Sequence, residues 1–174
     1  MLLRVATPED ALSVARVHVR SWQAAYRNLL PAEYLDRLRA EDRAKRYNFE
    51  TTDPSQPSTT VAVEGGAVVG FVTVAPAQDA DAQGSGELCA LYVDPDWWGR
   101  RLGCALIKQG RYRLLELGFQ DAVLWVMLGN TRAERFYSGD GWNNEGMRRT
   151  ASVWDTTVDE IRYRRQLAVD AVDA

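Results

Sequence analysis

The sequence has no apolar stretch long enough to cross a membrane. A spanning helix needs about 20 predominantly apolar residues, and every apolar run in the 174 residues is far shorter. The opening residues MLLRVATPED also lack the apolar core of a secretory signal, because Arg4, Glu9 and Asp10 interrupt them. We therefore expect a cytoplasmic protein without a membrane segment.

Histidine and cysteine are scarce, with one histidine and two cysteines in the chain. Metal sites need ligands at short, regular spacings, and Cys89 and Cys104 each stand alone. No metal site is expected, and two isolated cysteines fit a reducing compartment. A nucleophilic role for Cys104 is disfavoured, because His18 lies far away in the sequence.

The chain also lacks an excess of positive charge. It carries 21 Lys and Arg against 24 Asp and Glu, a net charge of −3, so nothing attracts nucleic acid or anionic lipid overall. The length and the 46% apolar content are those of a globular protein. We expect a single domain over residues 1–174, with 168–174 as a loose tail.

Hydrophobic periodicity predicts four helical segments. In the first, Thr7 is suited to cap the helix and Pro8 to occupy its first position. In the last, Thr131 and Glu134 fit a capping box. The predicted segments cover residues 8–22, 31–50, 102–117 and 130–142.

Alternating or continuous apolar runs predict the strands. They cover residues 2–7, a hairpin over 59–76, then 87–95 and 122–128, and two more strands to about Leu167 around a turn at 154–157. The strand, helix and strand between 87 and 128 require a parallel pair joined by a crossover helix. The expected fold is α/β (α+β): a mixed, twisted, mostly antiparallel sheet of about seven strands with helices on both faces.

The stretch VDPDWWGRRLGCALIKQG places glycines and arginines where a strand hands over to a helix. The first turn of a helix has free N–H groups and a partial positive charge, so it can hold phosphate. The alternative is an ordinary turn with solvent-facing arginines. The candidate phosphate-binding residues are Trp98, Gly99, Arg100, Arg101, Leu102, Gly103 and Cys104.

Four stretches of the chain resemble the GNAT superfamily of N-acetyltransferases. GELCALYVDPDWWGRRLGCALI is similar to the acetyl-CoA motif of that family, and AVLWVMLGNTRAERFYSGDGW to the second half of its site. EIRYRRQL looks like its closing strand, and WQAAYRNLLPAEYLDRL like the paired helices of one subgroup. The resemblance implies a GNAT-like sheet with a central parallel β-α-β acetyl-CoA site. It also implies transfer of the acetyl group of acetyl-CoA to an amine.

Two residues depart from the family's loop pattern. Trp98 replaces the usual first polar residue, and Arg101 stands where glycine is usual. The side chain of Arg101 either crowds the pyrophosphate or pairs with it. Gly99 and Gly103 keep the close approach of the backbone.

The resemblance assigns further coenzyme contacts to two strand ends and a short helix. The backbone of Leu91, Tyr92 and Val93 would bind the pantetheine arm like an added strand, while their side chains pack in the core. Beyond the second strand, the implied contacts are Asn130, Ala133 and Phe136. Asn130 is equally suited to cap the helix.

The resemblance makes Tyr137 the general acid that protonates the departing thiolate. The alternative for a lone tyrosine is a place in the core. Glu87 starts the coenzyme strand and is our candidate base for the attacking ammonium group, against the alternative of a solvated strand-edge acid. Glu145 and Asp155 are weaker candidates.

The first helix and the loop after it would cover the acceptor pocket in the family resembled. Trp22, Tyr26 and Leu30 are therefore candidate acceptor contacts, with a place in the core as the alternative for Trp22. His18 lies on the same stripe and fits a packed histidine better than a catalytic one. Trp97 and Trp98 either pack beside the coenzyme or mark a dimer contact.

Two other functions compete with the transferase. One is a non-catalytic acyl-CoA-binding regulatory module on the same fold, which Arg101 favours and Tyr137 and Asn130 oppose. The other is a nucleotide-binding protein, which the lack of a Gly-x-Gly-x-x-Gly or Lys-Ser/Thr loop disfavours. The acidic balance of the chain leans towards a cationic small amine as acceptor, and a homodimer is common in the family resembled.

Overall fold

The computed structural model describes residues 1–168, so all but the first residue of the expected loose tail lies outside the described residues. A seven-stranded sheet has the order β1-β2-β3-β4-β5-β7-β6. Only β4 and β5 pair in parallel, and the other pairs are antiparallel. This confirms the predicted mixed sheet. Its strands are β1 (Leu2–Val5), β2 (Ser58–Glu64), β3 (Ala67–Pro76), β4 (Gly86–Val93), β5 (Asp121–Met127), β6 (Asn143–Val153) and β7 (Thr156–Gln166).

Five α-helices accompany the sheet in the described part of the chain: α1 (Ala11–Ala25), α2 (Ala32–Arg37), α3 (Ala40–Ala44), α4 (Leu102–Glu116) and α5 (Thr131–Gly139). The single helix predicted over 31–50 is wrong, because Leu38 and Arg39 adopt extended conformations between α2 and α3. Arg39 Nη1 donates to the carbonyl oxygens of Asp36 (2.8 Å) and Leu38 (3.0 Å). These bonds take up carbonyls that a continuing helix would use.

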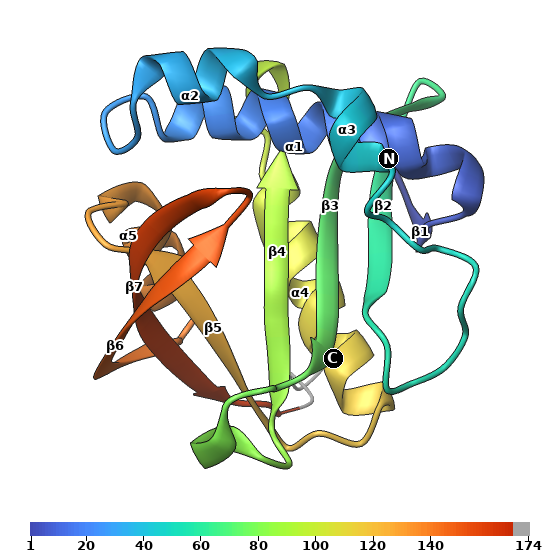
Figure 1. Cartoon of the computed structure of the whole chain (residues 1–174). Coiled ribbons are helices and arrows are strands. Elements are labelled where there is room, and N and C mark those ends of the chain that lie inside the picture. The colour runs from blue at the N-terminus through green and yellow to red at the C-terminus, as the bar shows by residue number, and fades with distance from the viewer. Residues whose placement is uncertain (169–174) are drawn as a thin grey trace.

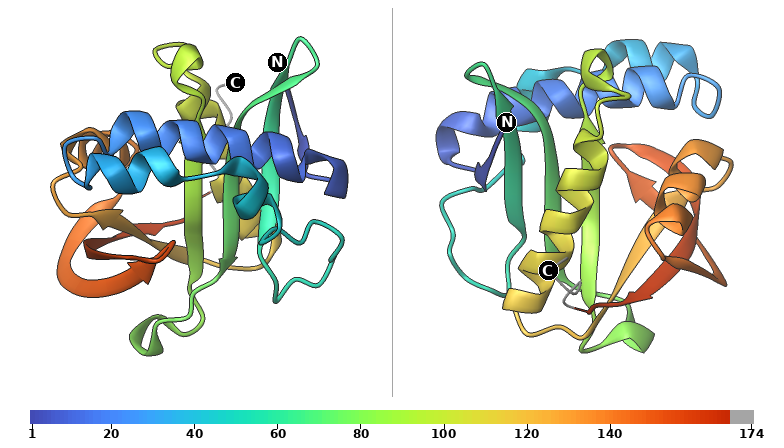
Figure 2. Two further views of the ribbon diagram at one scale, coloured as in Figure 1. Left: turned by 45° about the horizontal axis from the view of Figure 1, so that its top comes forward. Right: turned by 180° about the vertical axis from the view of Figure 1, so that it is seen from behind.

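The helices cover opposite faces of the sheet (Figure 2). Helix α1 crosses one face, where Val14 and Val17 pack with Val61 and Phe71. Helix α4 lies along the other face and packs into the larger apolar core. No helix in the described residues combines the length and the apolar character needed to span a bilayer.

Strands β4 and β5 separate soon after they begin (Figure 1). They pair only at Gly86 with Ala122 and at Glu87 with Val123. Just beyond, the register between β3 and β4 skips Cys89, since Leu88 pairs with Val74 and Ala90 with Thr73. Such a bulge increases the local twist of a strand. It therefore lies where β4 turns away from β5 and the sheet splits.

The tip of the β6–β7 hairpin is a two-residue turn, Trp154–Asp155, within the predicted turn region. Both residues have left-handed backbones, with φ of 54° and 62°, as the favoured two-residue hairpin turn requires. The Trp154 ring packs on His18 and Trp22, with centroids 4.7 and 4.8 Å apart. Its carbonyl accepts a 2.6 Å hydrogen bond from the Tyr34 hydroxyl. The tip is thereby fixed to α1 and α2.

Candidate active site

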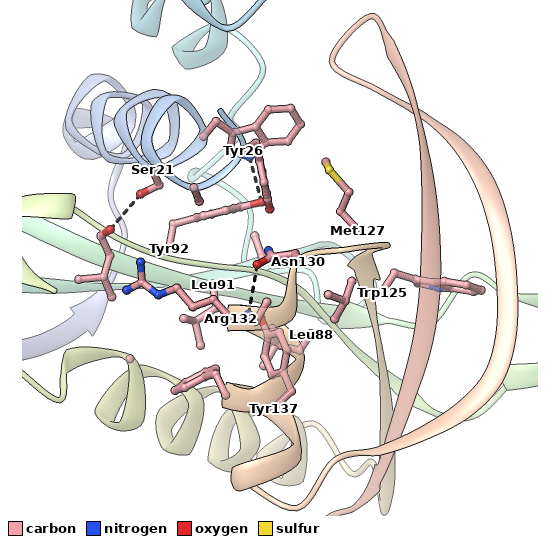
Figure 3. A pocket seen from close by; sticks show the side chains of 18 of the residues that line it. Ser21, Tyr26, Leu88, Leu91, Tyr92, Trp125, Met127, Asn130, Arg132 and Tyr137 are labelled. Carbon is pink, nitrogen blue, oxygen red and sulfur yellow. Dashed lines mark hydrogen bonds between the residues drawn. The ribbon is translucent and has the colours of Figure 1, made fainter. Parts of the chain in front are cut away.

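The separation of β4 and β5 holds a cavity of about 530 Å³ (Figure 3). It gathers residues from α1, β4, the start of α4, β5, α5 and the β6–β7 hairpin. Arg100 and Leu30 do not line it. The other predicted site residues all do: Trp22, Tyr26, Glu87, Leu91, Tyr92, Val93, Trp98, Gly99, Arg101, Leu102, Gly103, Cys104, Asn130, Ala133, Phe136 and Tyr137.

The first turn of α4 opens into the cavity. Arg101 precedes the helix with a left-handed backbone (φ 61°) and gives it no side-chain cap. The amides of Leu102, Gly103 and Cys104 therefore keep the free N–H groups of a helix start. A Cβ atom on Gly103 would lie 3.3 Å from the Phe136 ring, so glycine lets α5 approach this turn. The arrangement suits a negatively charged group.

Trp98 anchors the loop that precedes this turn. Its indole Nε1 donates a 2.8 Å hydrogen bond to the Val93 carbonyl, and the Arg132 guanidinium lies 3.6 Å from its ring centroid. The side chain is half-buried at the cavity. It packs beside the start of α4, and its predicted contact with the coenzyme stays a prediction. Arg100 instead lies over the Trp97 ring, at 4.6 Å.

Beyond Glu87, the edge of β4 that faces β5 has no strand paired to it among the described residues. Leu91, Tyr92 and Val93 lie on this stretch. The Val93 carbonyl is occupied, because Ser21 Oγ also donates to it at 2.9 Å. An extended ligand can add to the edge between Leu88 and Tyr92 in the manner of a strand.

Asn130 caps helix α5. Its side-chain oxygen accepts a 3.2 Å hydrogen bond from the Ala133 amide, so the expected capping box of Thr131 and Glu134 is wrong. Thr131 is already the first helical residue. The carboxamide of Asn130 still borders the cavity, as Figure 3 shows.

Tyr137 projects from α5 towards the cavity (Figure 3). Its ring packs edge-on against Phe136 and Trp142. No described residue makes a hydrogen bond with its hydroxyl, which is therefore available to a ligand. Burial, helped by Tyr92 and Asp140, raises the pKa of Tyr137 above that of a free phenol. The hydroxyl is thus protonated at neutral pH.

Glu87 lines the cavity where β4 and β5 separate. Burial raises the pKa of its carboxyl group, although Arg149 opposes the shift. The two weaker candidates lie elsewhere. Glu145 is held by Arg162 at 2.6 Å and Arg164 at 2.7 Å, and Asp155 is exposed at the hairpin tip. Neither lines the cavity.

Aromatic side chains form the wall on the α1 side. Trp22 and Tyr26 are buried, and Trp22 Nε1 donates to the Tyr92 hydroxyl at 3.0 Å. Leu30 packs behind them against the same cluster. His18 is buried too and shares a 2.8 Å hydrogen bond with Tyr47. Burial, together with Arg43, holds the pKa of His18 well below its usual value. It is a packed, neutral histidine, as predicted.

Comparison with known proteins places this site in a family. Residues 19–142 match the Acetyltransferase (GNAT) family. The chain belongs to this family. It is therefore an acyltransferase, and acetyl-CoA is the acetyl donor that GNAT acetyltransferases use. The expected family is confirmed.

Individual relatives agree with this assignment. The chain is 31% identical over 131 residues to the uncharacterized N-acetyltransferase YuaI of Bacillus subtilis, covering 74% of this chain and 72% of YuaI. It is 40% identical over 87 residues to the mycothiol acetyltransferase of Sanguibacter keddieii, which spans 49% of this chain and only 28% of that protein. The fold matches that of yncA from Salmonella typhimurium, solved with its cofactor acetyl-CoA, with a TM-score of 0.70 at 17% identity over 100% and 98% of the chains.

Sequence reasoning missed one wall of this GNAT cavity. It is formed by residues of β5, β6 and β7, and period-2 patterns predict strands without showing which of them line a site. The residues missed on this wall are Trp125, Val126, Met127, Arg149, Val153, Val158 and Glu160, and those missed elsewhere in the lining are Ser21, Ala25, Leu88, Cys89, Ala90 and Arg132.

Replacing Arg101 by glycine is expected to separate backbone strain from coenzyme binding. A left-handed non-glycine residue costs about 1 kcal/mol, so Arg101→Gly should raise the free energy of unfolding by up to about 1 kcal/mol. No described residue pairs with the Arg101 guanidinium, which lines the GNAT cavity beside the helix start. Its loss should raise KM for acetyl-CoA at least about 10-fold, because a hydrogen bond to a charged group contributes about 1.5 kcal/mol or more.

Denaturant titration and steady-state kinetics would measure the two effects. Arg101→Asn is the control, because asparagine tolerates the left-handed region but carries no charge. It should reproduce the rise in KM with little change in stability. An unchanged KM in both variants would show that the guanidinium does not meet the coenzyme.

Proposed function

We propose that this chain transfers the acetyl group of acetyl-CoA to a primary amine of a small molecule or peptide. The amine attacks directly, without a covalent enzyme intermediate. The observation that carries the proposal is the cavity, which connects the first turn of α4 with Glu87 and Tyr137. A phosphate-binding helix start, a candidate base and a candidate acid thus border one space between two separating strands.

In this proposal the pyrophosphate of acetyl-CoA binds the amides of Leu102, Gly103 and Cys104, with Arg101 pairing its charge. The pantetheine arm then runs along the free edge of β4. The thioester reaches the part of the cavity between Glu87 and Tyr137. Orientation of the two reactants supplies much of the rate.

The chemical step removes two protons from the acceptor nitrogen and delivers one to the leaving sulfur. The ammonium group of the acceptor first gives a proton to Glu87, directly or through water. The amine nitrogen then attacks the thioester carbonyl carbon, the C–S bond breaks, and the nitrogen releases its second proton, which reaches Tyr137 through water and replaces the proton that Tyr137 gives to the sulfur. The raised pKa of Glu87 makes this carboxylate a stronger base than an exposed one.

The Tyr137 hydroxyl donates a hydrogen bond to the sulfur as its negative charge develops, and the proton passes to the thiolate. A free thiol has a pKa of about 8.5, below the roughly 10 of a tyrosine phenol, so Tyr137 first stabilises the developing thiolate through the hydrogen bond. The proton transfer is completed as the positively charged acceptor nitrogen, an acid once it has attacked the carbonyl, returns a proton to Tyr137.

Cys89 supports direct attack over an acyl-enzyme route. Its side chain lines the cavity close to Glu87. Cys89 is an exposed residue, but its place beside Glu87 in the cavity raises the pKa of its thiol through desolvation and the nearby carboxyl group. A protonated thiol is a poor nucleophile. The acceptor amine is therefore the better nucleophile in this cavity.

Acetyl-CoA is expected to raise the melting temperature of the protein by roughly 5–10 °C. A ligand at 100 times its dissociation constant stabilises by about 2.7 kcal/mol, and a domain of this size shifts by about 2–4 °C per kcal/mol. Thermal denaturation with acetyl-CoA, CoA, NAD and ATP would measure this. CoA should act like acetyl-CoA, and NAD and ATP should not. A shift with NAD or ATP alone would favour the nucleotide-binding alternative.

Turnover separates the enzyme from a non-catalytic coenzyme-binding module. The unpartnered hydroxyl of Tyr137 and the raised pKa of Glu87 favour the enzyme. Release of CoA should be followed with a panel of amines at saturating acetyl-CoA. A thermal shift without turnover of any amine would establish the module instead.

A further inference from the structure

Arg149 and Glu160 form an ion pair on the part of the cavity wall that β6 and β7 provide. They are directly opposed residues of β6 and β7, and Arg149 Nε donates to Glu160 Oε2 at 2.7 Å. Glu160 is also the register partner of Met127 on β5. All three residues line the cavity. A cation and an anion thus lie side by side on an otherwise apolar wall.

The Arg149 guanidinium is only partly used by the protein. Its Nη1 reaches Asp79 at 3.4 Å, and no described residue accepts a hydrogen bond from Nη2. The Trp125 ring lies 4.0 Å from the guanidinium carbon and orients it. The side chain is 37% exposed. Arg149 therefore retains donors that a ligand in the cavity can use.

Arg162, two residues further along β7 than Glu160, shows the contrast. Its side chain is only 3% exposed, and its donors reach Asp81, Glu145 and Asp79. It is a fully paired structural cation. Of these two arginines, only Arg149 combines a place on the cavity wall with unused donors.

We infer that Arg149 and Glu160 select an acceptor amine that carries a carboxylate close to its amino group, as an amino acid does. The inference rests on the proposed function. Arg149 binds the carboxylate, and Glu160 and Glu87 attract the ammonium group. The two charges of an amino acid are separated by one carbon atom, so one molecule can meet both members of a cross-strand pair.

This chemistry disfavours an acceptor with positive charges alone. A second positive charge on the acceptor would be repelled by the Arg149 guanidinium, which lies 2.7 Å from Glu160. Apolar residues border the pair, namely Met127, Val153 and Val158. They suit the side chain of an amino acid better than a further charge.

The test compares free amino acids with their C-terminal amides. Acetylation of alanine, leucine, methionine and phenylalanine would be measured at saturating acetyl-CoA, beside each amide. Rates would be expressed per unprotonated amine, because amidation lowers the pKa of the amino group. The wild-type protein should prefer the best free acid over its amide at least tenfold in kcat/KM. Equal or faster acetylation of the amides, or turnover of polyamines alone, would overturn the inference.

Arg149→Gln should abolish the preference. We expect kcat/KM for the free acid to fall at least tenfold and that for the amide to change less than threefold. Arg149→Lys keeps a positive charge beside Glu160, but a lysine cannot bind a carboxylate through two parallel hydrogen bonds as a guanidinium can. We therefore expect a preference for the free acid that lies between those of the wild type and Arg149→Gln. Arg148→Gln removes the same charge from the neighbouring exposed position, which lies outside the cavity lining, and should leave the preference intact.

An equal loss for acid and amide in Arg149→Gln would make Arg149 structural and overturn the inference. Failure of the proposed function has a different signature. In that case acetyl-CoA gives no thermal shift, or no amine of either kind is acetylated, and the inference falls with it. Acetylation of amides without preference leaves the transferase standing and removes only the acceptor class.

Discussion

Replacing Tyr137 by phenylalanine is expected to lower kcat about 100-fold and to leave KM for acetyl-CoA within about threefold. The substitution removes one hydroxyl that no described residue bonds, so the fold loses no internal hydrogen bond. What is lost is the donor to the departing thiolate, and positioned acids contribute about 10²- to 10⁴-fold. We expect the lower end, because the raised pKa of Tyr137 makes it a weak acid.

Steady-state kinetics with acetyl-CoA and the best amine would measure the effect. Tyr112→Phe is the matched control, since Tyr112 lies on α4 outside the cavity and contacts Lys108. Its kcat should be unchanged. The same pKa shift predicts no loss of activity from ionisation of Tyr137 between pH 7 and 9. A wild-type kcat in the Tyr137→Phe variant would show that Tyr137 is not the general acid.

Glu87→Gln is expected to lower kcat/KM for the amine at least 100-fold while making the protein more stable at pH 7. The loss follows from removing the base that receives the ammonium proton. The gain follows from the raised pKa of the buried carboxyl. The folded state binds this proton more tightly than the unfolded state does, so stability is lost as the pH rises through the raised pKa. Glutamine is neutral and escapes this loss.

The melting temperatures of wild-type and Glu87→Gln protein should be compared across pH. The variant should melt higher at pH 7, and the difference should disappear below about pH 4.5, the usual pKa of a glutamic acid. The acid limb of the wild-type pH–rate profile should lie above that value and be absent in the variant. Wild-type activity in Glu87→Gln would leave a water chain as the proton acceptor.

Glu145→Gln is the control with the opposite sign. Burial favours the neutral form of Glu145, but hydrogen bonds from Arg164 and Arg162 prevail and hold the pKa of its carboxyl below the usual value. Its ionised form therefore stabilises the folded state above the unfolded pKa, and this stability is lost as the pH falls. The Glu145→Gln variant should have a lower melting temperature than the wild type at pH 7. Its pH–rate profile should keep the acid limb.

The parts of the site that could be predicted from the sequence have local signals. The glycines and arginines before α4 lie in one short stretch of the sequence, and the aromatic pair on α5 lies in another. Each stretch resembles a motif of the GNAT family, so its residues could be predicted without knowledge of the fold. The missed wall depends on register instead. Met127, Glu160 and Arg149 are neighbours because β7 pairs with β6 on one side and with the more distant β5 on the other, in one particular register. Helix periodicity also could not show that Arg39 would end α2 by binding its carbonyls.

The contact between the tip of the β6–β7 hairpin and α1 limits how far β4 and β5 can move apart. Strands β4 and β5 are joined at their starts by only two residue pairs, and the far side is bridged where Trp154 packs on α1. The gap between β4 and β5 is therefore bridged at both ends, and it cannot widen unless the packing of Trp154 on α1 loosens. Trp154 and Tyr34 make this contact and lie outside the cavity lining. Under the proposed function, we expect substitutions there to change which amines fit while the reacting groups stay in place.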